Sequence, residues 1–346
     1  MSKETTQQEC SVRVGPLVNI PGLLLELGHD PGPIFTRNGF VLSEFDDTEH
    51  RIPYIRGSQL LADCVAETGN EAFGLRLGQL AGPSYLGIAG FLARTASSVG
   101  QALEELVVNL SLHDEGGRCS LHIEGNYSQF SFHIHQPGVS ATAHIYDLSA
   151  VMMYEIMRAL CGNDWNATQI LLTRKKPADL SPYARYFRTD IRYDSENCSI
   201  VFPSHNLQLK PPMADELFHH HLKQQASELH KMQNKEVLET LPAVLQSCLL
   251  RGGCSVREIA NAFGVQERTL HRRLKASGTS FRRELGRARE CLSTQLLKTS
   301  GLPICDIATS LGYADSSGFI RAFKRWTGSS PAAWRKQNSR NQAPGL

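Results

Sequence analysis

Histidines and carboxylates that stand close together in this 346-residue sequence are the residue types able to bind a metal or transfer a proton. His133 and His135 share one face of a predicted strand, as in a cupin metal site. Such a site would need a following Glu, where Gly138 and Val139 stand instead. The histidine run 219–221 lies on a predicted helix, where adjacent side chains diverge. We therefore expect no metal site and interpret the run as a solvated patch.

The sequence shows no arrangement of residues suited to catalysis. The acidic pairs Asp46-Asp47 and Glu104-Glu105 are adjacent, so their side chains diverge on a helix or a strand. There is no G-x-S-x-G, no H-E-x-x-H and no phosphate-binding glycine-rich loop. Nine cysteines lie between Cys10 and Cys305 without a C-x-x-C pair, which predicts reduced and mostly buried thiols. We expect a protein that is not an enzyme and that has no catalytic residue, cofactor or metal.

Charge is distributed unevenly along the chain, although the net charge is only +2. Residues 251–340 hold 17 Lys and Arg against 6 Asp and Glu, which gives this segment a net charge of +11. The remaining residues hold 19 against 28, a net charge of −9. A basic segment beside an acidic body indicates that one module meets a polyanion, with nucleic acid as the first candidate. On charge alone, a solvated basic face without a partner stays open.

Length and composition indicate a globular protein of two or three domains. Apolar residues make up 41% and charged residues 20% of the chain, which is within the ordinary globular range. No apolar stretch approaches the ~20 residues that cross a bilayer, and the first residues of the chain are polar. We expect a cytoplasmic protein with no membrane segment.

The elements that would position functional residues differ along the chain. Up to residue 212, helices are mixed with short strands, which predicts an α+β domain. Apolar residues at helical spacing predict helices over 16–30, 59–80, 98–112 and 143–160. Alternating apolar residues predict strands at 121–123 and 130–134 around a turn at Gly125-Asn126, with further strands at 169–173, 191–193 and 199–202. Helices over 215–231 and 235–250 would connect this domain to the basic segment.

The basic segment contains an internal repeat. Apolar pairs and turn glycines recur 48 residues apart, Ile259-Ala260 and Phe263-Gly264 as Ile307-Ala308 and Leu311-Gly312. Two leucines recur 49 residues apart as phenylalanines, Leu270 and Leu274 as Phe319 and Phe323. Each copy has a short helix, a glycine at the turn and a second helix that is polar on one side, which is the layout of a helix-turn-helix. The first copy pairs 256–263 with 266–275, and the second pairs 304–311 with 315–326.

A predicted helix over 281–298 separates the two copies and would be about 27 Å long at 1.5 Å per residue. This length would hold two recognition helices close to the ~34 Å that separates successive major grooves on one face of B-DNA. One chain is therefore predicted to read two grooves.

Further residues of the repeat match a known family. They are Ile259-Ala260, Gly264-Val265, Arg268-Thr269-Leu270, Thr279-Ser280-Phe281, Ile307-Ala308, Leu311-Gly312-Tyr313, the run from Phe319 to Gly328, Pro331 and Trp334. With these residues, the segment 255–335 resembles the AraC/XylS-type DNA-binding domain. Residues 71–78, 87–90 and 197–203 resemble the sensor domain of the arabinose-binding-like branch of these regulators. The resemblance implies an α+β N-terminal sensor domain followed by an all-α double helix-turn-helix DNA-binding domain.

The resemblance also implies which side chains meet DNA. On the first recognition helix they are Arg268, Thr269, His271 and Arg272, which face bases, and Lys275, which faces the backbone. On the second they are Ser316, Ser317, Ile320, Arg321 and Lys324. Arginine suits this role because its planar fork can donate two hydrogen bonds to guanine O6 and N7. Ile320 replaces a small polar residue, so the second helix would either contact a thymine methyl or mainly bind phosphate.

By this resemblance the chain would be a sequence-specific transcription regulator, and a ligand-responsive activator rather than a repressor. Its partners would be double-stranded DNA, RNA polymerase and a small-molecule effector of unknown identity, with homodimer formation left open and no membrane contact. The expected domains are a ligand-sensing and dimerisation domain over 1–212, a helical connector over 213–250, the DNA-binding domain over 251–340 and a tail over 341–346.

Two other classes of protein remain open. One is an enzyme joined to the same DNA-binding module, as in methyl-transferring DNA repair regulators. The reactive Cys beside Pro and His and the zinc-type Cys cluster of those proteins are not visible in this sequence. The other is a ligand-independent dimeric repressor or architectural protein whose N-terminal part only dimerises. A small ligand that stabilises the N-terminal part would distinguish a sensor from both.

Overall fold

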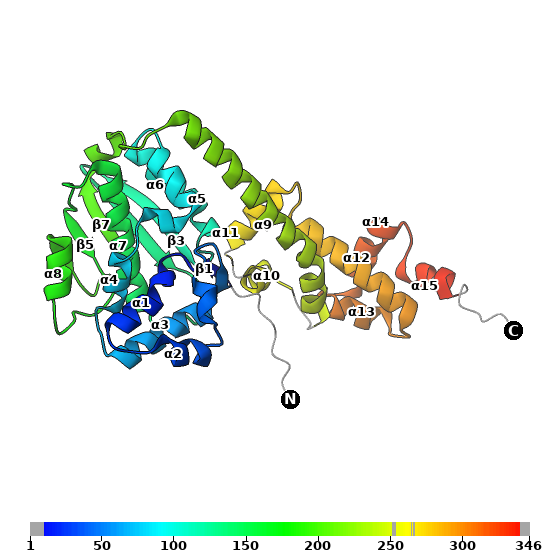
Figure 1. Cartoon of the computed structure of the whole chain (residues 1–346). Helices are drawn as coiled ribbons and strands as arrows, with labels where there is room; N and C mark the ends of the chain where they lie inside the picture. Colours follow the sequence, from blue (N-terminus) through cyan, green and yellow to red (C-terminus); the bar gives the residue numbers. More distant parts are fainter. Residues whose placement is uncertain (1–9, 251–253, 264, 266, 340–346) are drawn as a thin grey trace. The chain divides into compact units, whose positions relative to one another are not determined.

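The computed structural model describes residues 10–250, 254–263, 265 and 267–339 (Figure 1). Contacts divide the chain into an N-terminal unit that ends at His230 and a C-terminal unit that begins at Lys231. The predicted boundary at Arg251, the turn residue Gly264, the helix start at Gln266 and the tail 341–346 lie outside the described residues.

The N-terminal unit contains a five-stranded sheet with the strand order β3-β4-β7-β5-β6. The strands are β3 (Gly117–Glu124), β4 (Tyr127–Ile134), β5 (Gln169–Leu171), β6 (Asp190–Arg192) and β7 (Cys198–Pro203). Neighbouring strands are antiparallel except β5 and β6. Phe130 of β4 pairs with Leu121 and Ile200, and the turn at Gly125-Asn126 joins β3 to β4. The predicted strands and turn are confirmed.

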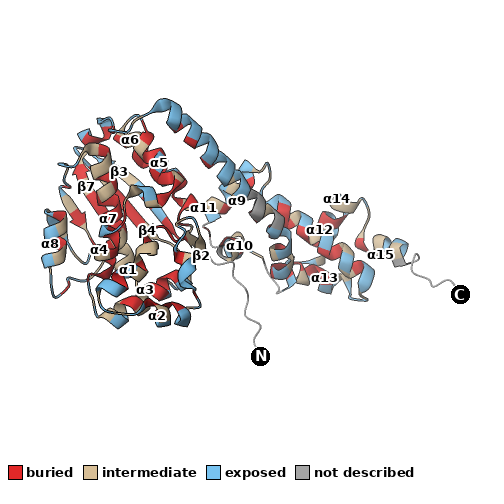
Figure 2. Cartoon of the chain, viewed as in Figure 1, coloured by how far each residue is buried: buried red, intermediate tan, exposed pale blue. Residues whose placement is uncertain are grey.

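Helices pack on this sheet and on one another (Figure 1). They are α1 (Ile20–Glu26), α2 (Pro31–Arg37), α3 (Tyr54–Thr68), α4 (Phe73–Gln79), α5 (Ile88–Thr95), α6 (Val99–Asn109), α7 (Thr142–Cys161) and α8 (Ser181–Phe187). A small sheet pairs β1 (Ser11–Arg13) with β2 (Arg51–Pro53), and 3-10 turns lie at Gly15–Asn19, Leu42–Phe45, Pro83–Leu86, Leu110–Leu112 and Ser204–Gln208. Helix α7 packs against α4, β4 and β7. Figure 2 shows the buried sides of these elements facing one another.

Two of the predicted helices of this unit have wrong boundaries. The helix expected over 59–80 is two helices, α3 and α4, because Gly69 ends α3 with a left-handed φ of 60°. The helix expected over 16–30 is a 3-10 turn at Gly15–Asn19 followed by α1. The helices expected over 98–112 and 143–160 are confirmed as α6 and α7.

A single helix, α9 (Glu216–Leu250), stands where two helices were predicted. The prediction was wrong because the residues between the two expected helices, 232–234, contain no glycine or proline to interrupt a helix. Pro242 lies inside α9, with its side chain exposed. Although α9 is long, no helix in the described part of the chain combines the length and apolar character that a bilayer-crossing segment needs.

The second half of α9 belongs to the core of the C-terminal unit. Val237, Leu241, Leu245 and Leu249 follow one another at intervals of four residues, so they share one face of the helix. All four are buried with the apolar residues of the helices that follow. This part of the expected connector therefore contributes to the stability of the C-terminal unit.

The rest of the C-terminal unit consists of two helix pairs joined by a strut. Its helices are α10 (Val256–Ala262), α11 (Glu267–Ala276), α12 (Phe281–Thr299), α13 (Ile304–Ser310), α14 (Ser316–Thr327) and α15 (Pro331–Ser339). The turn glycine of the second pair, Gly312, has a φ of 73°, as expected for a residue that must adopt a left-handed conformation. Leu270, Leu274, Phe319 and Phe323 are fully buried. The predicted repeat and its core positions are confirmed.

Candidate functional site

The first predicted recognition helix, α11, turns its basic side chains to solvent. Arg268, His271, Arg272 and Lys275 are exposed and Thr269 is half-buried, whereas the two leucines of the helix are fully buried. Within the described residues, the charged groups of the two arginines and the lysine have no hydrogen bond or ion pair. Their charges are therefore available to an anionic partner.

The second recognition helix, α14, is fixed at its start by an N-cap. The carboxylate of Asp315 accepts a hydrogen bond from the N–H of Gly318 at 2.7 Å. The predicted contacts follow, with Ser316 half-buried and Ser317, Ile320, Arg321 and Lys324 exposed. The side chain of Ile320 is an apolar group on an otherwise polar face, 38% exposed. This face can contact both an apolar group and an anion.

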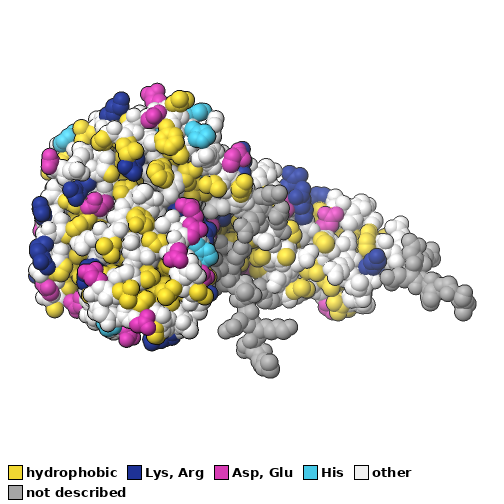
Figure 3. All heavy atoms as spheres, viewed as in Figure 1, with side chains coloured by type: hydrophobic (Ala, Val, Ile, Leu, Met, Phe, Trp, Pro, Cys, Tyr) yellow, Lys and Arg dark blue, Asp and Glu magenta, His cyan; other side chains and the backbone are white. Residues whose placement is uncertain are grey.

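A cationic groove lies between the start of α12 and α14. The arginines that line it are Arg282, Arg283, Arg287, Arg289, Arg321 and Arg325, beside the carboxylate of Glu290. On the face drawn in Figure 3, Lys and Arg side chains gather along one edge of the C-terminal unit. Of these arginines, only Arg321 was predicted from the sequence to contact DNA. Three of the others, arginines 282, 283 and 287, could have been found from their close spacing over the first turns of a predicted helix.

The arginines of the groove have different partners. Arg287 pairs with Glu284 at 3.0 Å. Arg289 donates from Nε to the carbonyl oxygen of Leu311 at 2.9 Å, and its guanidinium carbon lies 4.7 Å from the ring centre of Tyr313. Arg289 therefore ties the strut to the turn of the second helix pair. The remaining four have no ion pair in the part of the chain that the structure describes, so the groove attracts anions.

His219 is buried, which corrects the interpretation of residues 219–221 as a solvated patch. Its Nδ1 lies 3.2 Å from Thr95 Oγ1 and 3.2 Å from Leu92 O, and its Nε2 lies 3.4 Å from Glu105 Oε1. The two histidines that follow are exposed. The prediction was wrong because three consecutive histidines do not indicate which of them faces the protein interior. The buried Leu222, three residues after His219, marks the buried face of α9.

Metal-binding residue types are dispersed in this structure. His133 and His135 are each half-buried on β4 and the segment that follows it. Within residues 10–250, 254–263, 265 and 267–339, no three His, Cys, Asp or Glu side chains form a group able to hold a metal ion. No disulfide joins the nine cysteines, all of which lie in the described residues, and five of them are buried.

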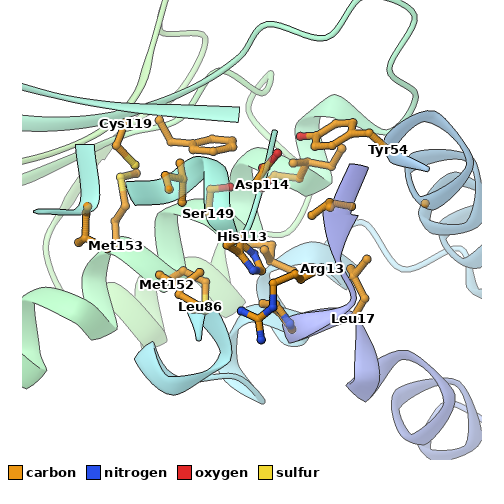
Figure 4. Close-up of a pocket in the computed structure, with 18 of the residues that line it drawn as sticks. Arg13, Leu17, Tyr54, Leu86, His113, Asp114, Cys119, Ser149, Met152 and Met153 are labelled. Atoms are coloured by element: carbon orange, nitrogen blue, oxygen red, sulfur yellow. Dashed lines mark hydrogen bonds between the residues drawn. The ribbon is translucent and has the colours of Figure 1, made fainter. Parts of the chain in front are cut away.

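The N-terminal unit contains a cavity of about 110 Å³ (Figure 4). It is lined by β1, α3, α6, β3, β4 and α7. Most lining side chains are apolar, among them Leu106, Phe130, Phe132, Met152 and Ile156. No ligand-binding residue was predicted from the sequence, and a cavity of this kind can hold a small apolar molecule.

Arg13 and His113 form a polar end of the cavity. They are 5% and 6% exposed, respectively. Arg13 pairs with Glu49 through Nη2, but neither Arg13 Nε nor His113 Nδ1 has a hydrogen-bond partner among the described residues. Burial, together with the positive charges of Arg13 and Arg51, lowers the pKa of His113 to about 3. The imidazole is therefore neutral at pH 7.

Gly15 provides the space for the ring of His113. Its φ is +40°, which side chains rarely adopt. A Cβ at this position would lie 2.7 Å from Cε1 of His113 and 2.9 Å from the carbonyl oxygen of Tyr85. Both the backbone conformation and the contact require glycine here.

Asp114 is a second buried titratable group beside the cavity. Its Oδ1 accepts hydrogen bonds from the N–H groups of Gly116 and Gly117, each at 2.7 Å. Burial raises the pKa of Asp114 to about 7, although these two hydrogen bonds and the charge of Arg51 oppose the rise. In Figure 4 its carboxyl group points towards Tyr54, whose pKa is raised by burial and by the charge of Asp114.

Two family profiles match the chain, one in each unit. The profile described as "Arabinose-binding domain of AraC transcription regulator, N-term" matches residues 28–211. The profile described as "Helix-turn-helix domain" matches residues 259–337. The first of these spans more than half of the chain.

Similar proteins include two whole-length relatives and a solved structure. The ornithine utilization regulator of Pseudomonas aeruginosa is 26% identical over 303 residues, which cover 84% of this chain and 86% of the relative. The HTH-type transcriptional regulator VirS of Mycobacterium tuberculosis is 25% identical over 332 residues, which cover 94% and 96%. The crystal structure of the transcriptional regulator CdpR from P. aeruginosa is 22% identical, with a TM-score of 0.45 over 88% of this chain and 96% of that chain. The chain belongs to the AraC family of transcription regulators.

Proposed function

We propose that this DNA-binding transcription regulator is a ligand-responsive activator that reads two successive major grooves with α11 and α14. The observation that carries the proposal is that both helices bury an apolar side and expose a row of polar and basic side chains on the other. Recognition helices present such rows to base edges and phosphates. The strut α12 has 19 residues and is about 28 Å long, which supports a separation near one turn of DNA.

In this proposal the two recognition helices contribute differently. Arg268, Thr269, His271 and Arg272 of α11 face bases, and Lys275 contacts the DNA backbone. On α14, Arg321 faces bases beside two serines and an isoleucine, and Lys324 contacts phosphate. Because α14 has fewer side chains that can contact base edges, it contributes more to affinity than to sequence preference.

The cationic groove extends this interface. Arg282 and Arg283 are exposed at the start of α12, and Arg325 is exposed on α14. We assign these three side chains to the phosphate backbone beside the second major groove. Contacts of this kind position a protein on DNA and make its affinity strongly dependent on salt.

A binding-site selection with the full chain and two variants tests these roles. Arg272→Ala should cost about 1–3 kcal/mol of binding free energy and relax the preference at one or two base pairs. Lys324→Ala should weaken binding to all sequences alike, because a phosphate contact carries no sequence information. The reverse pattern, with base preferences kept by the first variant and changed by the second, would contradict the assignment.

The N-terminal residues 1–212 are proposed to sense the effector, with 213–250 as connector and 251–340 as the DNA-binding domain. The cavity supports an effector site, and membership of the AraC family supports activation through RNA polymerase in the cytoplasm. Transcription with purified RNA polymerase, with and without a metabolite extract, tests this. Full output that no extract alters would contradict ligand response and leave DNA binding unaffected.

Self-association is also part of the proposal. Leu217 and Phe218 at the start of α9 are 83% and 46% exposed, which supports an apolar contact with a second copy. Light scattering of the full chain should give the mass of a dimer, and Leu217→Glu should reduce it. A monomer at concentrations that saturate DNA would contradict this part.

A further inference from the structure

We infer that the cavity of the N-terminal unit binds a small monocarboxylic acid with an apolar body. The carboxylate would lie at Arg13 and His113, and the body between α6, α7 and β4. The inference rests on the proposed ligand-responsive function, because it names the chemical class of the effector. Figure 4 shows the arrangement, with Arg13 and His113 side by side and Met152 nearby.

The apolar body follows from the walls and the size of the cavity. Its lining is dominated by aliphatic, aromatic and thioether side chains, and its volume is about 110 Å³. An apolar cavity of ~150 Å³ holds the six carbons of benzene, so this smaller cavity fits a body of about four or five carbons. Ser58 and Ser149 also line the cavity, but their hydroxyls already donate to the carbonyl oxygens of Ile55 and Ile145.

A sugar does not suit these walls. Each of its hydroxyl groups would lose hydration on entry and would need a hydrogen-bond partner in return. The lining has polar groups without a partner at one end, near Arg13 and His113, and is mostly apolar elsewhere. Its other polar side chains include Ser58, Ser149 and Asp114, which already make hydrogen bonds within the protein. The ligand therefore has its polar atoms gathered at one end.

Two buried nitrogens at the polar end of the cavity indicate that the ligand carries a hydrogen-bond acceptor there. Arg13 Nε and His113 Nδ1 are buried and have no partner among the described residues. Buried polar groups nearly always find a hydrogen-bond partner, and an arginine Nε can only donate. The neutral imidazole can also donate from Nδ1. A single ligand group that accepts hydrogen bonds from both nitrogens would satisfy them, and a carboxylate has two oxygens for this purpose.

The charge around His113 favours an anion at this place. The positive charges of Arg13 and Arg51 both lower the pKa of His113, and their partners Glu49 and Glu115 are not among the residues that line the cavity. The carboxyl group of Asp114 is held by two backbone N–H groups and points towards Tyr54. An acid is therefore preferred over an alcohol of the same length and over an ammonium ion.

Titration calorimetry of the full chain without DNA tests the inference, with hexanoate, 1-hexanol, hexylammonium and arabinose as probes. Hexanoate should bind about tenfold more tightly than 1-hexanol, because a charge-assisted hydrogen bond is replaced by a neutral one. Shortening the acid to pentanoate should weaken binding about fourfold, the effect of one buried methylene. Hexylammonium and arabinose should give no heat of binding.

Three variants separate the two ends of the site. His113→Leu should lose the preference for hexanoate over 1-hexanol, whereas His113→Asn should keep it, because an amide nitrogen can replace Nδ1. Met152→Trp fills the cavity and should abolish binding of both probes. The cooperative unfolding transition of each variant shows whether the N-terminal unit is folded. If His113→Leu does not fold, Met152→Trp still tests whether the probes bind in the cavity.

The outcomes distinguish this inference from the proposed function. Equal or tighter binding of 1-hexanol or hexylammonium, or hexanoate binding that survives in Met152→Trp, overturns the carboxylic-acid assignment and leaves DNA binding and response to another effector intact. Binding of hexanoate in the predicted order supports the assignment. If that binding changes neither operator affinity nor transcription, the carboxylic-acid site is supported but the ligand-responsive function is contradicted.

Discussion

Removing two arginines from the cationic groove should change how DNA binding depends on salt. Arg282 and Arg283 are exposed, and neither has an ion pair within the described residues, so replacing both with Gln breaks no ion pair there. Each phosphate that a protein neutralises contributes about −0.9 to the slope of log Kobs against log salt concentration. The double variant should therefore have a slope less steep by about 1.8.

The magnitude is large enough to measure. Over a fourfold rise in salt, from 50 to 200 mM, a slope difference of about 1.8 corresponds to about twelvefold in affinity. The wild-type chain should lose about twelvefold more affinity than the double variant over this range. Base preferences should not change, because phosphate contacts carry no sequence information.

Fluorescence anisotropy of a labelled duplex, titrated with the full chain at several salt concentrations, measures this slope. Lys298→Gln is the matched control, since Lys298 is exposed on the same helix and lies roughly 24 Å from Arg282 along its axis. The control should keep the wild-type slope. A double variant with the wild-type slope, or a control that changes as much as the double variant, would refute the assignment of phosphate contacts to the groove.

Three further predictions concern stability, measured as the free energy of unfolding in urea. Leu241→Ala should destabilise the C-terminal unit by about 2–5 kcal/mol because Leu241 is fully buried, while Leu250→Ala, at a site 64% exposed, should have little effect. Gly15→Ala should cost more than about 1 kcal/mol, from the left-handed backbone and the contact with His113; an unchanged stability would contradict that contact. The folded-state pKa of Asp114 is raised to about 7, so its contribution is present below its unfolded pKa and lost as pH rises towards 7. Asp114→Asn should remove this loss, and an unchanged pH profile would contradict the raised pKa.

The repeat in the C-terminal unit was predictable because its signals are local. A helix pair needs apolar residues at fixed spacing and a glycine at its turn, and both recur along the sequence at nearly constant offsets. The buried Leu270 and Phe319 are equivalent positions of this pattern. The rotation of each recognition helix follows from the same spacing, so the exposed residues could be named from the sequence.

The cavity could not be predicted because the residues that form it are not connected by any local sequence pattern. Arg13, His113 and Met152 come from segments far apart in the sequence, and no periodic pattern connects them. Their roles depend on burial and on which hydrogen bonds are already made, and both are properties of the folded chain. The unbroken α9 was missed because local sequence gives weak information where helix-forming residues continue without a stop signal.

The contact of Arg289 with Leu311 and Tyr313 bears on the spacing of the DNA sites that such a regulator can recognise. Arg289 fixes the second helix pair to the strut that separates the two recognition helices. In the proposed mode of binding, this contact restricts the spacing and the relative rotation of the two contacted base clusters. One base pair inserted between the two contacted base clusters would rotate one cluster by about 34° relative to the other. If both helices read DNA as proposed, the spacer is part of the recognised signal, and insertions or deletions within it should lower the affinity for a site whose contacted bases are all intact.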